Sequence, residues 1–401
     1  MIFMRRLALQ GSTRRLLTRL HRWSGLTVMA LLTIAGLTGG VLVFRDALDR
    51  AVNPHLRVVT PGTQRASLQA VIDRVEQRFP DARVSIVTLQ STASDPLIMY
   101  LAKKPARLGG SAEPLQASEV FVNPYTGGIL GQRGSSRVIA SREYLIPLIV
   151  RLHYSLLLGT VGVWIMGISA IIWLLTSIVG LALAWPATWR SLTGWTGTLA
   201  VRRGEGAYKA NYDVHRSLGV GLLPLWIVLA FTSVYLNFPN LVRLTTAMIS
   251  PVTAMPLPAA RPADYPIVTP EQAIHRALGS VPSARAFGLT RDFANGWYSV
   301  RLRLPGDVNL SGNSRAYVDF SSGEVKAVRL ATAATAGQRF LFWQFPLHSG
   351  EAFGLPGRIV IGLAAVTLVV MCGTGFYVWL RGWTVRRRNA RTARVGSAQI
   401  T

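Results

Sequence analysis

The chain has 401 residues, half of them hydrophobic, and a formal net charge of +25 at pH 7. A single cysteine, Cys372, excludes a disulfide framework, a C-x-x-C motif and a thiolate-held metal or iron–sulfur site. The basic residues gather beside apolar runs, and this distribution argues against nucleic acid as a partner.

Four apolar runs are long enough to cross a bilayer, which takes about 20 residues. They cover 26–44, 161–185, 220–238 and 359–380, and none contains Asp, Glu, Lys or Arg. The first run is too long for the apolar region of a signal peptide, and no clear cleavage site follows it. The sequence therefore predicts an α-helical integral membrane protein with four transmembrane helices, the first an uncleaved anchor.

Positive charge at the ends of these runs predicts the orientation. Residues 1–25 and 381–401 each carry six arginines and no acid, and 186–216 carries five basic residues against two acids. Such clusters stay on the cytoplasmic side. We expect a multi-pass protein of the bacterial inner membrane, with both termini and the middle loop cytoplasmic and the segments about 45–160 and 239–358 periplasmic.

The two periplasmic segments repeat one pattern. An amphipathic helix is predicted within 67–84 and again within 269–286, each stopped by a proline. The stretches 120–130 and 316–326 each read as a strand, a turn with a glycine, and a second strand. Each segment is therefore expected to form a small α+β module with an antiparallel sheet, within a tandem duplication of a two-helix unit.

The order of these features divides the chain into eight segments. They are the cytoplasmic N-terminus with the first span (1–46), the first periplasmic module (47–146), the second span with its histidine segment (147–186), the cytoplasmic loop (187–214), the third span (215–239), the second module (240–345), the fourth span with its histidine segment (346–381) and the basic cytoplasmic tail (382–401).

Two of the six histidines stand just before the first and third apolar runs, in the same short sequence motif. His21 and His215 are each followed by arginine and, four residues on, by Gly25 and Gly219. Residues four apart share one face of a helix, so each glycine leaves space beside its histidine.

Two further histidines precede the second and fourth runs. His153 and His348 each have glycine six and nine residues later, and they follow His21 and His215 by 132 and 133 residues. His153 lies 32 residues before the end of its run, about 48 Å of helix, which exceeds a bilayer core of about 30 Å. These two histidines are therefore expected on short segments above the membrane or on helices that project outward.

The four histidines are predicted to be axial ligands of two haems. His21 and His215 would meet at the inner face, and His153 and His348 at the outer face. Imidazole binds Zn, Cu, Fe and haem, and two imidazoles leave a bare ion under-coordinated whereas a porphyrin supplies four more nitrogens. The alternative is that each histidine only tolerates the membrane interface, which does not explain four similar positions.

Several polar residues near the histidines are candidate partners for haem propionates. Arg19, Arg22 and Arg216 stand at the inner side, and Arg151 and Tyr154 at the outer side. Positive-inside anchoring explains each single arginine equally well.

Other candidates carry less weight. An isolated histidine is more often solvated, and aromatic or basic residues near a membrane have ordinary explanations. The isolated histidines are His55 and His275. The aromatic residues Trp343 and Phe345 are candidates to cover the outer haem. Arg301 and Arg303 are candidates to contact anionic chelates.

The combined layout resembles the PepSY-associated transmembrane proteins, which include iron-regulated membrane proteins and FoxB-like ferrisiderophore reductases. The resemblance rests on four spans that begin with histidines and enclose two helix–sheet modules, over about residues 12–385. It implies two b-type haems per chain, held by His21, His215, His153 and His348. It also implies reduction of a ferric siderophore or another periplasmic iron chelate. Only 21 residues follow Leu380, so the electron donor is expected to be a separate molecule, either cytoplasmic or in the membrane.

Two functions of different classes follow. The first is an oxidoreductase that carries electrons across the membrane to release iron as Fe(II), with catalytic residues unassigned. The second is a membrane-anchored PepSY protein that senses or inhibits a peptidase without a redox cofactor. No acid–base or nucleophile constellation suggests hydrolysis, and the uncharged spans argue against a transport path.

Overall fold

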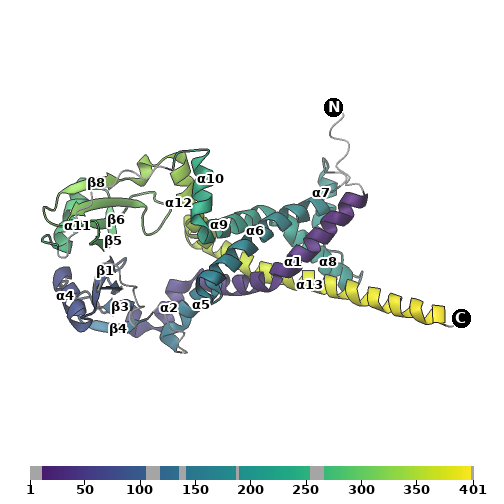
Figure 1. The fold of residues 1–401 in the computed structure, drawn as a ribbon, viewed down its shortest axis with the longest axis horizontal. Helices are drawn as coiled ribbons and strands as arrows, with labels where there is room; N and C mark the ends of the chain where they lie inside the picture. Colours follow the sequence, from purple (N-terminus) through teal and green to yellow (C-terminus); the bar gives the residue numbers. More distant parts are fainter. Residues whose placement is uncertain (1–10, 105–117, 135–140, 187–188, 253–265, 399–401) are drawn as a thin grey trace. The chain divides into compact units, whose positions relative to one another are not determined.

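A computed structural model describes residues 11–104, 118–134, 141–186, 189–252 and 266–398 (Figure 1), with side chains described up to residue 389. The first ten residues, with two of the six N-terminal arginines, lie outside this description. The chain divides into two compact units. The helical unit comprises Met1–Val43, Val150–Val242 and Leu347–Thr401, and the sheet unit comprises Phe44–Ile149 and Arg243–Pro346.

The helical unit contains the membrane-length helices. Among the described residues, α1 (Gly11–Leu42), α6 (Gly159–Ala184) and α13 (Gly354–Ala398) include a stretch long and apolar enough to cross a bilayer. A fourth candidate is the pair α8 (Ala207–Gly221) and α9 (Leu223–Asn237), which qualifies when taken as one span. The prediction of a helical membrane protein is confirmed.

The third apolar run is not one straight helix, as its uninterrupted composition had suggested. α8 and α9 are bent by 70° at Leu222. Pro224 stands in the first turn of α9, where its missing N–H costs nothing but where it cannot continue the hydrogen bonds of α8. The indole of Trp226 donates to the carbonyl of Leu218 across the bend (3.1 Å), which ties the two helices together.

The core of the helical unit lies where α1 packs against α6 and α13 and where α6 packs against α9. Trp173 of α6 and Trp226 of α9 have ring centroids 6.2 Å apart and are both buried. Large apolar side chains on facing helices therefore hold the bundle together. The remaining members of this core include Val28, Leu32, Leu229, Ala230, Ala364 and Leu368.

Three shorter helices complete the elements near the bundle. They are α5 (Leu145–Ser155), α7 (Leu192–Leu199) and α12 (Ala336–Ser349). The C-terminal parts of α5 and α12 belong to the helical unit, and each carries one histidine.

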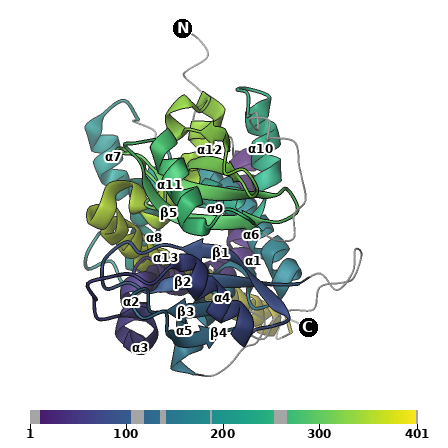
Figure 2. The same ribbon diagram turned by 90° about the vertical axis from the view of Figure 1, so that its left-hand side faces the viewer.

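The sheet unit is built on one antiparallel sheet of eight strands, in the order β4-β3-β2-β1-β5-β6-β7-β8. Figure 2 labels β1 to β5 of this sheet. The strands are β1 (Ala82–Thr88), β2 (Leu97–Lys103), β3 (Glu119–Val122), β4 (Ile129–Arg133), β5 (Arg285–Asp292), β6 (Trp297–Arg303), β7 (Ser314–Asp319) and β8 (Val325–Arg329).

Two helices pack on one face of this sheet. α4 (Leu68–Arg78) and α11 (Pro270–Ser280) bury an apolar stripe each against the alternate residues of the strands beneath. Ser67 caps the start of α4, and Thr269 forms a capping box with Gln272 at the start of α11. Both helices end before the prolines that the sequence placed after them.

The two predicted α+β modules are joined into a single sheet. β1 pairs with β5, with Val87 opposite Leu289, and the Arg291 guanidinium lies 2.6 Å from a Glu76 carboxylate oxygen across this joint. Each half therefore protects the edge strand that the other would leave open.

A buried ion network fixes α2 (Arg45–Val52) to the first half of the sheet. The Asp49 carboxylate accepts two hydrogen bonds from Arg133 at 3.0 and 2.9 Å. Burial opposes its charge, yet the hydrogen bonds from Arg133 and Asn53 and the charges of Arg133 and Arg57 hold the pKa of Asp49 below its usual range. The described part of the chain also contains two short helices, α3 (Pro54–Arg57) and α10 (Pro239–Ala247), and 3₁₀ turns at Arg142–Tyr144, Ala331–Ala333 and Glu351–Phe353.

Candidate functional site

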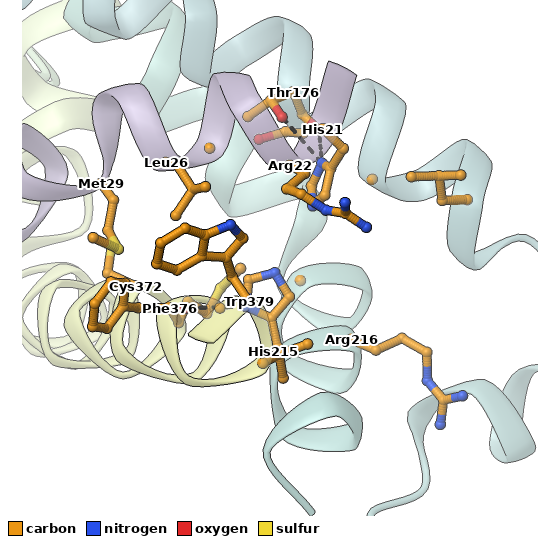
Figure 3. A pocket seen from close by; sticks show the side chains of 18 of the residues that line it. His21, Arg22, Leu26, Met29, Thr176, His215, Arg216, Cys372, Phe376 and Trp379 are labelled. Carbon is orange, nitrogen blue, oxygen red and sulfur yellow. Dashed lines mark hydrogen bonds between the residues drawn. The ribbon is translucent and has the colours of Figure 1, made fainter. Parts of the chain in front are cut away.

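Four histidines of the helical unit form two facing pairs. The ring centroids of His21 and His215 lie 6.2 Å apart, and those of His153 and His348 lie 6.3 Å apart. His21 lies on α1 and His215 on α8, with their imidazoles on opposite sides of one cavity (Figure 3). The second pair comes from α5 and α12. The pairing expected from the sequence thus agrees with the distances.

The first pair is oriented by backbone carbonyls of neighbouring helices. Nδ1 of His21 lies 3.1 Å from the carbonyl oxygen of Thr176, and Nδ1 of His215 lies 3.0 Å from that of Met371. A carbonyl only accepts, so each Nδ1 carries the proton and donates it. In the neutral ring this leaves Nε2 as a free electron pair, the form that binds a metal.

The second pair reaches the same tautomer through threonine hydroxyls. Nδ1 of His153 and of His348 lies 2.9 Å from the hydroxyl oxygen of Thr38 and Thr232, respectively. Each threonine hydroxyl already donates to the carbonyl four residues earlier, at 2.6 and 2.8 Å. The hydroxyl oxygen therefore accepts from Nδ1, and Nε2 is again free.

Glycines of the neighbouring helices lie against three of the imidazoles. A Cβ added at Gly180 or Gly375 would stand 3.0 Å from Cε1 of His21 or His215, and one at Gly39 would stand 3.1 Å from Cε1 of His153. Sequence reasoning missed these contacts. The available signal was a threonine followed by a small residue inside each of the four apolar runs, at 38–39, 176–177, 232–233 and 374–375.

A cavity of about 410 Å³ opens beside the first pair. Both Gly25 and Gly219 line it, as their spacing from the histidines predicted. A Cβ at Gly25 would meet nothing within 4 Å, so no protein atom requires a glycine there. Other residues along its wall include His21, Leu26, Met29, Thr176, His215, Cys372, Phe376 and Trp379.

Arginines but no carboxylates line this cavity. Arg22 and Arg216, expected from the sequence, are joined by Arg14 and Arg386, which were not expected. The Arg216 guanidinium is already engaged: it lies 3.1 Å from a carboxylate oxygen of the buried Asp213 and donates to two carbonyls at the end of α7.

The other residues proposed as partners for haem propionates are Arg19, Arg151 and Tyr154. Arg19 is exposed and does not line the cavity, because its position on α1 faces away from it. At the second pair, Arg151 is half-buried on α5, and Tyr154 is 47 % exposed. The structure gives no contact between either residue and His153 or His348.

Sharp turns follow both histidines of the second pair. Six residues after each histidine, Gly159 and Gly354 adopt φ of +57° and +62°. Nine residues after, a Cβ on Gly162 or Gly357 would stand 1.6 or 2.3 Å from the carbonyl oxygen of the residue two after the histidine. The glycine spacing read from the sequence therefore marks two close backbone approaches. It also places His153 and His348 on helices separate from the spans.

The weaker candidates lie elsewhere. His55, on α3, is 3.7 Å from a Glu143 carboxylate oxygen, and His275 is exposed on α11. Trp343 and Phe345 are 37 % and 36 % exposed on α12.

The fold and the histidine pairs define a class: a duplicated helical membrane protein with two facing imidazole pairs and an α+β sheet unit. The chain belongs to the family of the PepSY-associated TM region, whose match covers residues 18–381.

Part of the chain is similar in sequence to a bacterial protein. The chain is 28 % identical over 276 residues to a protein of Pseudomonas aeruginosa named "Uncharacterized protein PA4219". The match covers 62 % of this chain and 66 %, slightly under two thirds, of that relative.

Proposed function

We propose that this protein is an inner-membrane electron-transfer protein that holds two b-type haems, one between His21 and His215 and one between His153 and His348. The observation that carries the proposal is the two facing imidazole pairs at 6.2 and 6.3 Å, each with Nε2 free. A haem between two imidazoles supplies one-electron chemistry, because its iron alternates between the ferric and ferrous states.

The ring separations suit a shared metal. Metal–nitrogen bonds to imidazole are about 2.0–2.1 Å long, and each ring adds a radius of roughly 1.1 Å, so two imidazoles on opposite sides of one ion have centroids about 6.3 Å apart. Both pairs match this distance without any movement of their helices.

The donor set favours a macrocycle over a bare ion. Over the described part of the chain, no group of three or more His, Cys, Asp or Glu side chains is placed to hold a metal. Two imidazoles alone leave a transition-metal ion under-coordinated, whereas a porphyrin provides four equatorial nitrogens. The side-chain-free space at Gly25 and Gly219 gives a flat ring room beside the helices.

The cavity arginines support the same assignment. Arg14, Arg22 and Arg386 line the cavity from α1 and α13 and would pair with the carboxylates of the bound group. Arg216 pairs with Asp213 within α8 and ties α8 to the end of α7 through two carbonyls. Because its guanidinium is already engaged, Arg216 holds the helix that carries His215 and is less available to a carboxylate of the bound group.

The two pairs stand at opposite ends of α1. His21 lies on this helix, and Gly39, which contacts His153, follows it by 18 residues or about 27 Å of helix. This is close to the thickness of a bilayer core, about 30 Å. With both termini cytoplasmic, as the arginine clusters indicate, electrons would enter at His21–His215 and leave at His153–His348.

We propose a periplasmic ferric chelate, such as a ferric siderophore, as the acceptor. Each bound Fe(III) takes one electron to become Fe(II), which oxygen-rich chelators hold less tightly, and the iron is released for uptake. Electrons would come from a cytoplasmic or membrane donor.

The first test is haem stoichiometry of the purified full-length protein. We expect a red preparation with two b-type haems per chain. His21→Ala and His215→Ala should each remove the same spectral component, and His153→Ala and His348→Ala should each remove the other. His275→Ala, an exposed histidine, should remove neither.

Two results would contradict the proposal. A colourless preparation from haem-replete cells would favour the alternative, a membrane-anchored PepSY protein that senses or inhibits a peptidase. Loss of the same component in His21→Ala and His153→Ala would show that the pairs are assigned wrongly.

A further inference from the structure

Three arginines stand in one row across the second half of the sheet. Arg301 of β6 lies opposite Arg315 of β7, and Arg315 lies opposite Arg329 of β8. Their neighbours Val300 and Leu302 belong to the core under α11, so the row lies on the helix-free face. Like charges directly opposite each other destabilise a sheet, which makes this row costly for the protein alone.

In the first half of the sheet, the equivalent row contains both a positive and a negative charge. Tyr100, Glu119 and Arg133 stand opposite one another on β2, β3 and β4, at the positions equivalent to the three arginines. There Arg133 has two carboxylate partners, Asp49 at 2.9 Å and Glu119 at 3.4 Å. The duplicated half has arginine where this half has tyrosine and glutamate.

Arg301 and Arg315 are the two arginines of the row that face each other on β6 and β7. Arg301 is half-buried, and this burial together with the charge of Arg315 lowers the pKa of Arg301. Within the described residues, neither Arg301 nor Arg315 takes part in an ion pair with a carboxylate.

Aromatic rings flank the arginines. The Arg329 guanidinium lies 5.5 Å from the ring centroid of Tyr317, and the Tyr317 ring meets Trp297 at 5.9 Å. Tyr317 stands two residues along β7 from Arg315 and thus on the same face. The row therefore combines fixed positive charge with an apolar border.

We propose that Arg301, Arg315 and Arg329 bind a small, multiply anionic iron chelate with carboxylate-type oxygens. Three neighbouring strands span about 10 Å, the size of such a chelate, and guanidinium forks match carboxylate oxygens in pairs. Bound anionic oxygen would supply beside Arg301 and Arg315 the negative charge that Glu119 provides in the first half. The inference rests on the proposed function in that this chelate is the electron acceptor.

The test measures binding without electron transfer. Full-length protein in detergent is titrated by calorimetry with gallium(III) citrate, in which gallium replaces iron but is not reduced. We expect wild-type protein to bind it, with an affinity that falls as salt is added. Arg301→Gln and Arg315→Gln should each weaken binding tenfold or more, whereas the exposed Arg65→Gln should leave it within about twofold.

A second readout separates binding from folding. Because Arg315→Gln removes a like-charge contact on both sides, it should raise the midpoint of thermal unfolding while it weakens binding. A variant that only damaged the fold would lower both.

The inference is overturned if gallium citrate does not bind, or if Arg315→Gln binds it as wild type does. Equal weakening by Arg65→Gln would show that binding is unspecific charge attraction. Equal affinity for metal-free citrate would show that the site does not recognise the metal chelate. Because gallium accepts no electron, none of these results depends on haem content, and a failure of the haem measurement leaves them intact.

Discussion

At the scale of single residues, the two histidine pairs differ in the acceptor behind each Nδ1. Nδ1 of His21 and of His215 lies within hydrogen-bond distance of a backbone carbonyl and also of a threonine hydroxyl, that of Thr176 at 3.0 Å and that of Thr374 at 3.4 Å. Nδ1 of His348 has the hydroxyl of Thr232 alone among the described contacts. His153 donates to the Thr38 hydroxyl and has the Ala35 carbonyl nearby. A stronger acceptor at Nδ1 makes the imidazole a stronger ligand for ferric iron and lowers the reduction potential. If the proposed haems are present, we expect the His21–His215 site to have the lower reduction potential.

Thr232→Val tests this difference. The valine keeps the shape of the side chain but removes the acceptor from Nδ1 of His348. The reduction potential of one haem component should then rise, by about 59 mV if the electron-exchange equilibrium between the sites shifts tenfold. Spectroelectrochemical titration of the purified protein measures both components.

Two threonines serve as controls for this change. Thr176→Val removes a hydroxyl 3.0 Å from Nδ1 of His21 but leaves the carbonyl acceptor in place, and Thr367→Val removes a hydroxyl that bonds only within α13. Both should shift the potentials less than Thr232→Val does. A downward shift, or equal shifts in all three variants, would refute the hydroxyl as a tuning group.

At the scale of elements, the approach of each histidine helix to its span depends on glycine. Gly162 lets α6 begin against the carbonyl of Ser155 at the end of α5, and Gly357 lets α13 begin against the carbonyl of Gly350 after α12. Any side chain at these positions would force the helix starts apart. His153 and His348 would then leave their facing positions.

Gly162→Ala and Gly357→Ala should each reduce haem content from about two to about one per chain, with loss of the component assigned to His153 and His348. The reason is the overlap of the new Cβ with a carbonyl oxygen at 1.6 and 2.3 Å. The measurement is haem per chain with optical spectra. Gly373→Ala, whose Cβ would meet nothing within 4 Å, should retain both components, and retention by Gly162→Ala would contradict the account.

The sequence predicted the elements better than their contacts. Apolar length, proline stops and repeated histidine–glycine spacings indicated the spans, the two sheet halves and the pairs. The Thr–His hydrogen bonds join residues more than 110 positions apart, and no local pattern encodes them. The bend at Leu222 and the pairing of β1 with β5 also depend on tertiary packing.

At the scale of the whole molecule, both units are assembled from the two halves of the chain. In the helical unit α1 packs on α13 and α6 on α9, and in the sheet unit β1 pairs with β5. Each facing pair takes one histidine from each half, whereas the hydrogen bond behind each histidine stays within its own half.

Cutting the chain between the halves should therefore not separate them. A protease site inserted at Gly204, in an exposed loop before α8, interrupts no helix or strand. After cleavage, gel filtration should show one particle that contains both fragments, with both haem components retained. Fragments that elute separately in the same detergent would disprove assembly across the halves.

The strand order β4-β3-β2-β1-β5-β6-β7-β8 reads the same from either edge once the two halves are equated. Antiparallel pairing of β1 with β5 is the contact that two identical chains make across a twofold axis. A half-length chain with this pairing would form both imidazole pairs as a symmetric dimer, with each pair on its axis. Fusion of two such copies would release them from identical sequence. Arginine could then replace tyrosine and glutamate on one side of the sheet while the other side kept its balanced charges.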